Sequence, residues 1–393
     1  MKRLYKNQKN KTDQTIKTVD FKPKIDFRKE HWQWSIMDTY ILVKFLGSVF
    51  YSIALLMTII IVFDISEKIH KFLDNEVPIN AIIFKYYFNF IPYFVNLFFP
   101  LFTFISVIWF TSKLSGNNEV ISFFNGGISF YRFMFPYIVG AIILSIISLL
   151  MSNFLIPLTN ARMHDFNEEY LYKKRVITNT NIHFKSSENT YVYAERWRKQ
   201  TLEGERFTVE VLSADNGRIE TKVTAAQVQY NDSTKLWHLY DYSIRTFNEE
   251  GQNIRAGIET DTTFDFLPED FNNDITITET MSYGELTKFI DKERKKGSSL
   301  VKHYLIEKNK RIANPLSILI MTMLGLSVAT RKTRRGVGVH IFIGLFFVFT
   351  FIFFQQVSNV FAISEQLSPA LATWLPNLVY LVVCVVLLRF TPK

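Results

Sequence analysis

Residues 41–63 read ILVKFLGSVFYSIALLMTIIIVF, an apolar run with one charged residue, Lys44, near its start. About 20 consecutive apolar residues in an α-helix cross the ~30 Å hydrocarbon core of a bilayer. The run therefore predicts a membrane-spanning helix. It excludes a purely soluble enzyme and a disordered scaffold.

Five further runs of the same kind follow. The composition agrees, with 48% hydrophobic residues, 38 Phe and a mean hydropathy of +0.08. The second run is unusually long and contains Pro92 and Pro100, so we expect a kinked helix whose freed carbonyls are satisfied by neighbouring helices. The sequence thus predicts an α-helical integral membrane protein with six transmembrane helices, at residues 41–63, 81–110, 133–155, 313–330, 337–361 and 372–390.

A polar segment, residues 157–310, separates the third span from the fourth. Apolar and polar residues alternate in it, as in Phe207-Thr-Val-Glu-Val-Leu212, and turn signals such as Asp215-Asn-Gly-Arg218 separate the runs. This pattern predicts an inserted antiparallel β domain of the sandwich or jelly-roll type. After it, Ser282-Tyr-Gly-Glu285 forms a capping box that opens a helical connector through Lys296.

Basic residues in short loops set the expected orientation. The first 30 residues contain ten Lys or Arg, and Arg331-Lys-Thr-Arg-Arg335 contains four, whereas the opposite loop, 362–371, has Glu365 and no cation. We therefore expect both termini in the cytoplasm and the β domain in the periplasm of a bacterium. The domains are then a basic tail at 1–35, spans one to three at 36–156, the β domain with its connector at 157–310, and spans four to six at 311–393.

The sequence also argues against several other functions. The basic tail is followed within about ten residues by a span, so contact with anionic lipid is a better interpretation than nucleic-acid binding. The chain lacks a GxxxxGK[ST] phosphate loop, its seven His show no HExxH spacing, and Cys384 is its single cysteine. We therefore expect no metal or cofactor and no catalytic activity of its own, so that any active transport depends on a partner ATPase.

A candidate docking site for that partner lies between spans two and three. Residues 113–130 can form a short amphipathic helix, capped by Asn117 or Asn118, with Glu119 in its first turn and Gly126 and Gly127 at its end. One interpretation is an interfacial helix without special function. The other is a coupling helix that an ATPase grips.

Five segments carry a resemblance that covers about residues 36–390. They are Met37-Asp-Thr-Tyr-Ile41, Asn118-Glu-Val with Gly126-Gly-Ile-Ser129, Asn153-Phe-Leu-Ile-Pro157, Arg311-Ile-Ala-Asn-Pro-Leu316 and Leu371-Ala-Thr-Trp-Leu-Pro-Asn377. In this order, and with the central β domain, the chain resembles the LptF/LptG family of lipopolysaccharide-export permeases. The Asp-x-Tyr-Ile segment is more similar to LptG than to LptF.

The resemblance implies a subunit of an ABC transporter in the inner membrane. Two such chains, one of each type, would form a V-shaped cavity open to the outer leaflet. An LptB-like ATPase dimer would dock on the helix containing Glu119, Gly126 and Gly127. Lipopolysaccharide would enter between span one of one subunit and span five of the other, and pass to an LptC-like periplasmic bridge protein.

Phosphorylated lipid at the outer-leaflet interface calls for cations at the periplasmic ends of the spans. The resemblance places such contacts at the end of span one and just after span three. The candidates are Lys68, Lys71, Lys85, Arg162, His164 and Arg311. The alternative for each of them is a membrane anchor.

Acyl chains need an apolar lining, and the Phe-rich spans two and five are the candidates for it. The residues expected there are Phe94, Phe98, Phe102, Phe346 and Phe351, although lipid-facing packing explains them equally well. The main alternative function is an ABC mechanotransmission subunit that couples an ATPase to a periplasmic partner without moving lipid. Such subunits usually have four spans, so the three-plus-three arrangement argues against it.

Overall fold

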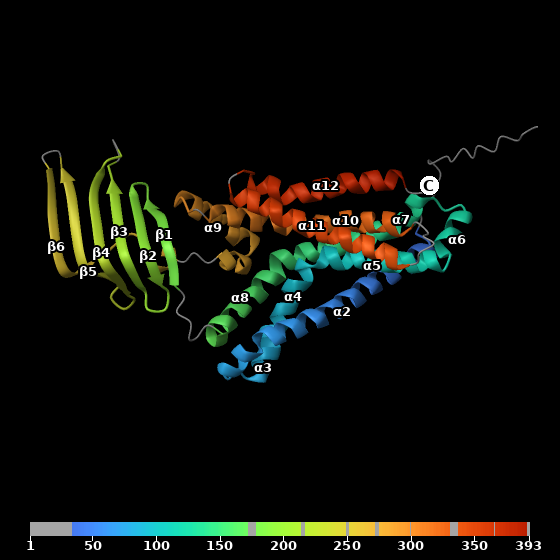
Figure 1. Ribbon diagram of the computed structural model, residues 1–393, viewed down its shortest axis with the longest axis horizontal. Coiled ribbons are helices and arrows are strands. Elements are labelled where there is room, and N and C mark those ends of the chain that lie inside the picture. Colours follow the sequence, from blue (N-terminus) through green and yellow to red (C-terminus); the bar gives the residue numbers. More distant parts are fainter. Residues whose placement is uncertain are drawn as a thin grey trace, which may run out of the picture.

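The computed structural model describes residues 34–171, 178–213, 217–248, 251–271, 275–298, 300–330, 337–364 and 366–390. The helices form one elongated body, and a β-sheet lies at one end of it (Figure 1). Most of the predicted basic tail and the loop 331–335 lie outside the described residues, as does Glu365.

The first half of the chain is helical throughout its described part. Its elements are α2 (Ile36–Asp74), α3 (Ile79–Ala81), the π-helix η1 (Ile82–Tyr87), α4 (Phe88–Leu97), α5 (Phe99–Gly116), α6 (Glu119–Asn125), α7 (Phe130–Leu150), the π-helix η2 (Met151–Leu155), α8 (Ile156–Phe166) and the π-helix η3 (Asn167–Leu171). The helices after the sheet are α9 (Tyr283–Lys295), α10 (Val301–Ala329), α11 (Val337–Ile363) and α12 (Pro369–Arg389). Among the described residues, five helices are long and apolar enough to cross a membrane, and the number is six if α3 to α5 form one bent span.

The second span is broken, as its prolines predict. The segment 79–97 meets α5 at an angle of 65°, with Phe98 at the break. Pro100 lies in the first turn of α5, where a missing N–H costs nothing, and its ring prevents a straight continuation from α4.

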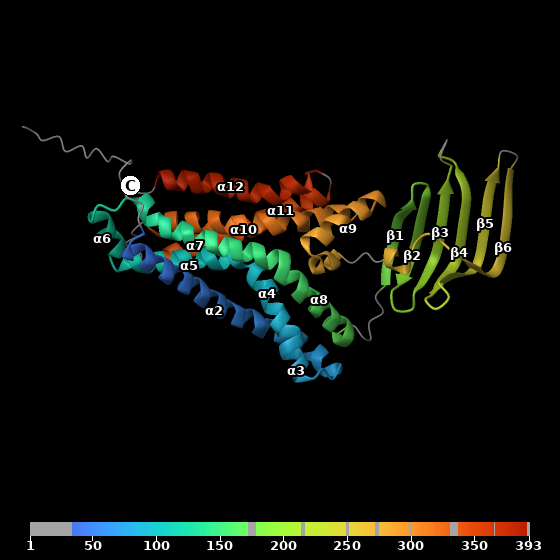
Figure 2. The same cartoon turned by 180° about the vertical axis from the view of Figure 1, so that it is seen from behind.

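Two spans continue as helices well beyond their apolar runs. The apolar run of α2 ends at Phe63, yet the helix continues to Asp74, and its extension contains an Asp64–Lys68 pair one turn apart. The third span likewise passes through Pro157 to Phe166, because the proline occupies the first turn of α8 and the π-helix η2 precedes it. Seen from behind, α2 diverges from α10, α11 and α12 towards the sheet end of the molecule (Figure 2).

The β domain is a single antiparallel sheet of six strands in the order β1-β2-β3-β4-β5-β6. The strands are β1 (Thr178–Ser187), β2 (Thr190–Arg198), β3 (Glu203–Leu212), β4 (Ile219–Asn231), β5 (Leu236–Asn248) and β6 (Gly251–Thr262). The predicted antiparallel domain is confirmed. Every strand pairs with its neighbour in sequence, because the connections are short, so the described residues form a meander in place of the two packed sheets of a jelly roll.

One face of this sheet carries an aromatic core that includes Trp197, Phe207 and Trp237. The chain after β6 folds back over this face, and Phe271 stacks on Trp197 with ring centroids 4.3 Å apart. Strand β6 does not follow the inward and outward alternation of the other strands, because nearly all of its residues are exposed, and it forms an open edge.

A glycine sets the separation between the first and third spans. A Cβ on Gly140 of α7 would lie 2.7 Å from the ring of Phe45, which is fully buried in α2. The two helices therefore approach each other through a position that tolerates no side chain.

We predict that Gly140→Ala destabilises the protein by about 1–3 kcal/mol, because the added methyl overpacks this contact. The melting temperature in detergent measures the effect. The control is Gly47→Ala in α2, where a Cβ meets no atom within 4 Å. Equal melting temperatures for the two variants would contradict this account of the α2–α7 contact.

Candidate functional site

The Met37–Ile41 segment begins α2 and fastens it to α7. Arg132 of α7 donates from Nη1 and Nη2 to the two carboxylate oxygens of Asp38, each at 2.5 Å. Asp38 is fully buried, and it also closes a capping box with Ser35. A bidentate, buried pair of this kind fixes both the position and the rotation of the first turn of α2.

The same segment contacts the predicted coupling helix, which is α6. Tyr40 donates its hydroxyl to Glu119 Oε2 at 3.1 Å, and the Asn117 side-chain amide donates to Oε1 at 3.1 Å. Asn118 occupies the N-cap position in the left-handed region (φ 64°), and its side chain makes no capping hydrogen bond. The predicted side-chain cap is therefore absent. Glu119 is held instead by Tyr40 of α2 and by Asn117, which precedes α6.

Helix α6 ends where the two glycines predict. Gly127 is left-handed (φ 84°), and the Ile128 N–H donates to the Phe123 carbonyl at 3.2 Å, which closes a Schellman turn. Val120 is buried among residues of α5 and α7. The helix thus lies across the end of the bundle that is farthest from the sheet (Figure 1).

Five of the six predicted substrate cations gather on one arm of the molecule, around the end of α2. Lys68 donates to Asp64 at 2.5 Å and also contacts Tyr86 of η1. Lys85 pairs with Glu169 at 3.2 Å. Lys71 and Arg162 are exposed, and neither has an ion-pair partner among the described residues. His164 lies 4.0 Å from Glu168.

Arg311 lies apart from this group and is buried. Its two terminal nitrogens donate to the carbonyls of Met281 and Thr278, both at 2.8 Å, and its Nε lies 3.7 Å from Glu307. This geometry ties the connector to α10. The connector is here the segment 275–298, which lies between the sheet and α10 and includes α9.

A second polar group occupies the same connector. Glu279 accepts from the Tyr93 hydroxyl and from the Asn160 amide, both at 3.4 Å, so that the connector touches both α4 and α8. We call Tyr93, Asn160 and Glu279 the polar junction. Burial, reinforced by the nearby Glu307 carboxylate, raises the pKa of Glu279 to about 7. Sequence reasoning missed the junction, because Glu279 is one acid among many in the polar segment.

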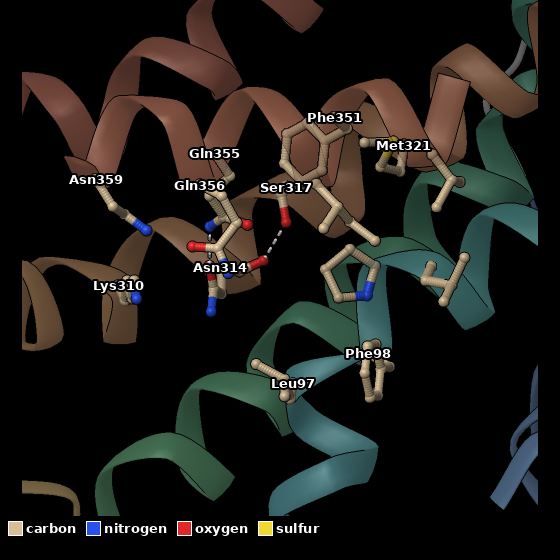
Figure 3. A pocket seen from close by; sticks show the side chains of 14 residues that line it. Leu97, Phe98, Lys310, Asn314, Ser317, Met321, Phe351, Gln355, Gln356 and Asn359 are labelled. Carbon is tan, nitrogen blue, oxygen red and sulfur yellow. Dashed lines mark hydrogen bonds between the residues drawn. The ribbon is translucent and has the colours of Figure 1, made fainter. Parts of the chain in front are cut away.

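A cavity of about 240 Å³ opens beside the break in the second span (Figure 3). It has an apolar wall with Phe98 and Phe351, and a polar wall where Gln355 donates to Asn314 at 3.2 Å. Of the five predicted lining phenylalanines, these two line it. Phe94 of α4 and Phe102 of α5 belong to an apolar cluster with residues of α2 and η1, and Phe346 is exposed.

No group of three or more His, Cys, Asp or Glu that could hold a metal occurs in the part of the chain that the structure describes.

The family of lipopolysaccharide export system permeases LptF/LptG matches residues 39–389. The chain belongs to the LptF/LptG family. It is therefore a lipopolysaccharide-export permease, the membrane subunit of a transporter and not itself an enzyme. Its apolar helices agree with a multi-pass protein of the inner membrane. No curated protein matches the chain in sequence.

We predict that Glu279→Gln stabilises the protein more at pH 8 than at pH 5. The raised pKa means that the folded state holds the proton, so the stability contributed by protonated Glu279 is lost as the pH rises from its ordinary value of 4.5 through about 7. The variant carries no ionisable group there. Its free energy of unfolding relative to wild type should therefore rise by roughly 1–3 kcal/mol between pH 5 and pH 8.

The melting temperature in detergent at each pH measures this advantage. Glu259→Gln, on exposed strand β6, is the control that should show no such change. A difference in melting temperature between wild type and Glu279→Gln that does not change with pH would contradict the burial of the Glu279 carboxylate in the polar junction.

Proposed function

We propose that this chain is one of two permeases, the LptG-like one, in an ABC exporter that extracts lipopolysaccharide from the outer leaflet of the inner membrane. An LptB-like ATPase dimer supplies the energy, and an LptC-like bridge protein receives the lipid in the periplasm. Both termini are then cytoplasmic, and the sheet is periplasmic. The observation that carries the proposal is the uneven packing of the spans, considered together with family membership.

The first and fifth spans, α2 and α11, have the smallest buried share of the five long apolar helices. Only 22% of the apolar window of each is buried within the chain, compared with 33% for α12, 50% for the third span and 67% for α10. Helices in lipid associate through close packing, so two loosely covered helices offer surfaces to another helical subunit or to acyl chains. These are spans one and five, which are the two that would form the lateral openings with a second permease.

The ATPase would dock on α6. Glu119 marks the start of that helix, and Tyr40 links it directly to the first span. Asp38, two residues before Tyr40, pairs with Arg132 of α7, so a displacement of α6 acts on α2 and α7 together. This arrangement couples a cytoplasmic motor to the helix that borders the lipid opening.

The phosphates of the lipid would meet the cations around the far end of α2. Lys68 and Lys85 are already paired with carboxylates, which leaves Lys71 and Arg162 as the principal contacts and Lys68, Lys85 and His164 as supporting ones. Arg311 has a positioning role, since its donors are occupied by backbone carbonyls of the connector.

The bridge protein would pair with the open edge of the sheet at β6. Its Ile254 and Ile258 side chains are 51% and 76% exposed, and an uncovered edge strand can accept a further strand through main-chain hydrogen bonds. Extracted lipid would then pass from the spans to a sheet that continues into the partner.

We predict that Glu119→Lys abolishes co-purification of the ATPase, because it reverses the charge at the docking surface. Tyr40→Phe should keep the ATPase bound but reduce lipopolysaccharide export severalfold at unchanged ATP hydrolysis, since it removes only the link to α2. Recovery of the ATPase with the tagged chain measures the first effect. Release of labelled lipopolysaccharide from proteoliposomes, together with ATP turnover, measures the second. Glu188→Lys, in an exposed turn of the sheet, is the control, and ATPase recovery with Glu119→Lys equal to that control would refute docking on α6.

We predict that Lys71→Glu with Arg162→Glu lowers photo-crosslinking of lipopolysaccharide to the end of α2 by about tenfold. Each contact with a lipid phosphate contributes on the order of 1 kcal/mol. Lys292→Glu on α9 is the matched control. Unchanged crosslinking in the double variant would show that these cations are membrane anchors.

A further inference from the structure

A groove at the α6 end of the bundle has no role in export as described above. It lies between α2 and α5 and has a volume of about 370 Å³. We define the groove by Lys44, Gly47 and Tyr51 of α2 together with Trp109 and Lys113 of α5. Tyr40 and Glu119, the contact between the first span and α6, line its outer end.

The two lysines give the groove a positive mouth. Lys44 and Lys113 are exposed, and neither forms an ion pair with any described residue. Glu119 also lines the groove, but both of its oxygens already accept hydrogen bonds from Tyr40 and Asn117. The three charged residues therefore leave one net positive charge, with two lysines free to bind an anion.

The deeper part of the groove is aromatic. The rings of Tyr51 and Trp109 stack with centroids 6.2 Å apart and planes at 20°. Lys113 Nζ lies 5.6 Å from the centre of the Trp109 ring, one helical turn along α5. A cation followed by aromatic surface, in this order from the helix end inwards, matches the order of headgroup and acyl chain in a phospholipid.

Gly47 keeps this space open. A Cβ at this position would meet no atom within 4 Å, so no neighbouring helix requires a glycine there. Glycine in a helix interior destabilises the helix relative to alanine. Close packing explains Gly140, but only the groove itself gives Gly47 a role.

We propose that the groove binds an anionic phospholipid from the leaflet on the α6 side, which is the cytoplasmic leaflet under the proposed orientation. Lys44 and Lys113 hold the phosphate, and an acyl chain lies along Gly47, Tyr51 and Trp109. The bound lipid fills the space beside Glu119 and so braces the coupling helix against the first span. The inference rests on the proposed function for the identity of that leaflet and of the coupling helix, but the binding itself does not depend on export.

The test is lipid binding to the purified full-length chain, without ATPase or lipopolysaccharide. The delipidated protein is titrated with phosphatidylglycerol or phosphatidylcholine in mild detergent, and bound lipids are counted by native mass spectrometry. We expect phosphatidylglycerol to bind at least tenfold more tightly. Lys44→Gln with Lys113→Gln should remove this preference, because both cations that attract the anionic headgroup are then neutral.

Filling the groove gives a second, independent variant. Gly47→Leu has room for its side chain and should abolish binding of both lipids at this site without loss of thermal stability. Arg389→Gln, a cation at the end of α12, and Gly338→Leu, an exposed glycine of α11 with open space, are the matched controls and should bind like the wild type.

Three outcomes would overturn the proposal. Equal binding of the two lipids, or binding that both variants leave unchanged, would show that the groove holds no anionic lipid. Loss of a co-purifying second permease in Gly47→Leu, with lipid binding intact, would assign the groove to a protein contact instead. None of the three affects the export role, because lipopolysaccharide release is measured separately.

Discussion

The buried ion pair between Asp38 and Arg132 holds the first span to the third at the α6 end of the bundle. Breaking such a pair would leave an unpaired buried charge at a cost of about 3–5 kcal/mol. Close to it, the Gly140–Phe45 contact brings α2 and α7 together, while the rest of α2 is covered sparsely. The helix is thus fixed at one end and loosely packed along its length, which is the condition for a span that borders a lateral opening.

Polar side chains collect where the helices of this protein are interrupted. Asn96, near the break in the second span, donates to Ser152 of the π-helix η2 and accepts from Ser148. Asn314, next to Pro315 in α10, accepts from Gln355. Such groups satisfy one another inside an apolar bundle and hold the bent shapes that the prolines create. The breaks therefore lie in one polar zone, beside the connector that carries the sheet.

The hydropathy pattern and the turn residues predicted much of this architecture, because spans and turns depend on residues that are close in sequence. The bend near Pro100 and the end of α6 at Gly127 follow from the backbone limits of proline and glycine. The helical extension of α2 beyond Phe63 was not predicted, because hydropathy identifies only the apolar part of a helix and not its polar continuation. The alternating pattern of the β domain does not distinguish a jelly roll from the single sheet observed. The burial of Arg311 and the polar junction at Glu279 depend on which distant segments meet, and no local pattern encodes those contacts.

We propose that this chain is one half of a two-permease exporter driven by a separate ATPase. The most direct measurement is purification of the tagged chain from its native membrane in mild detergent, with proteins and lipids identified by mass spectrometry. We expect a P-loop ATPase, a second six-span permease and bound lipopolysaccharide. Recovery of the ATPase with a periplasmic partner but without glycolipid would contradict it and indicate mechanotransmission, and recovery of the chain alone would contradict both.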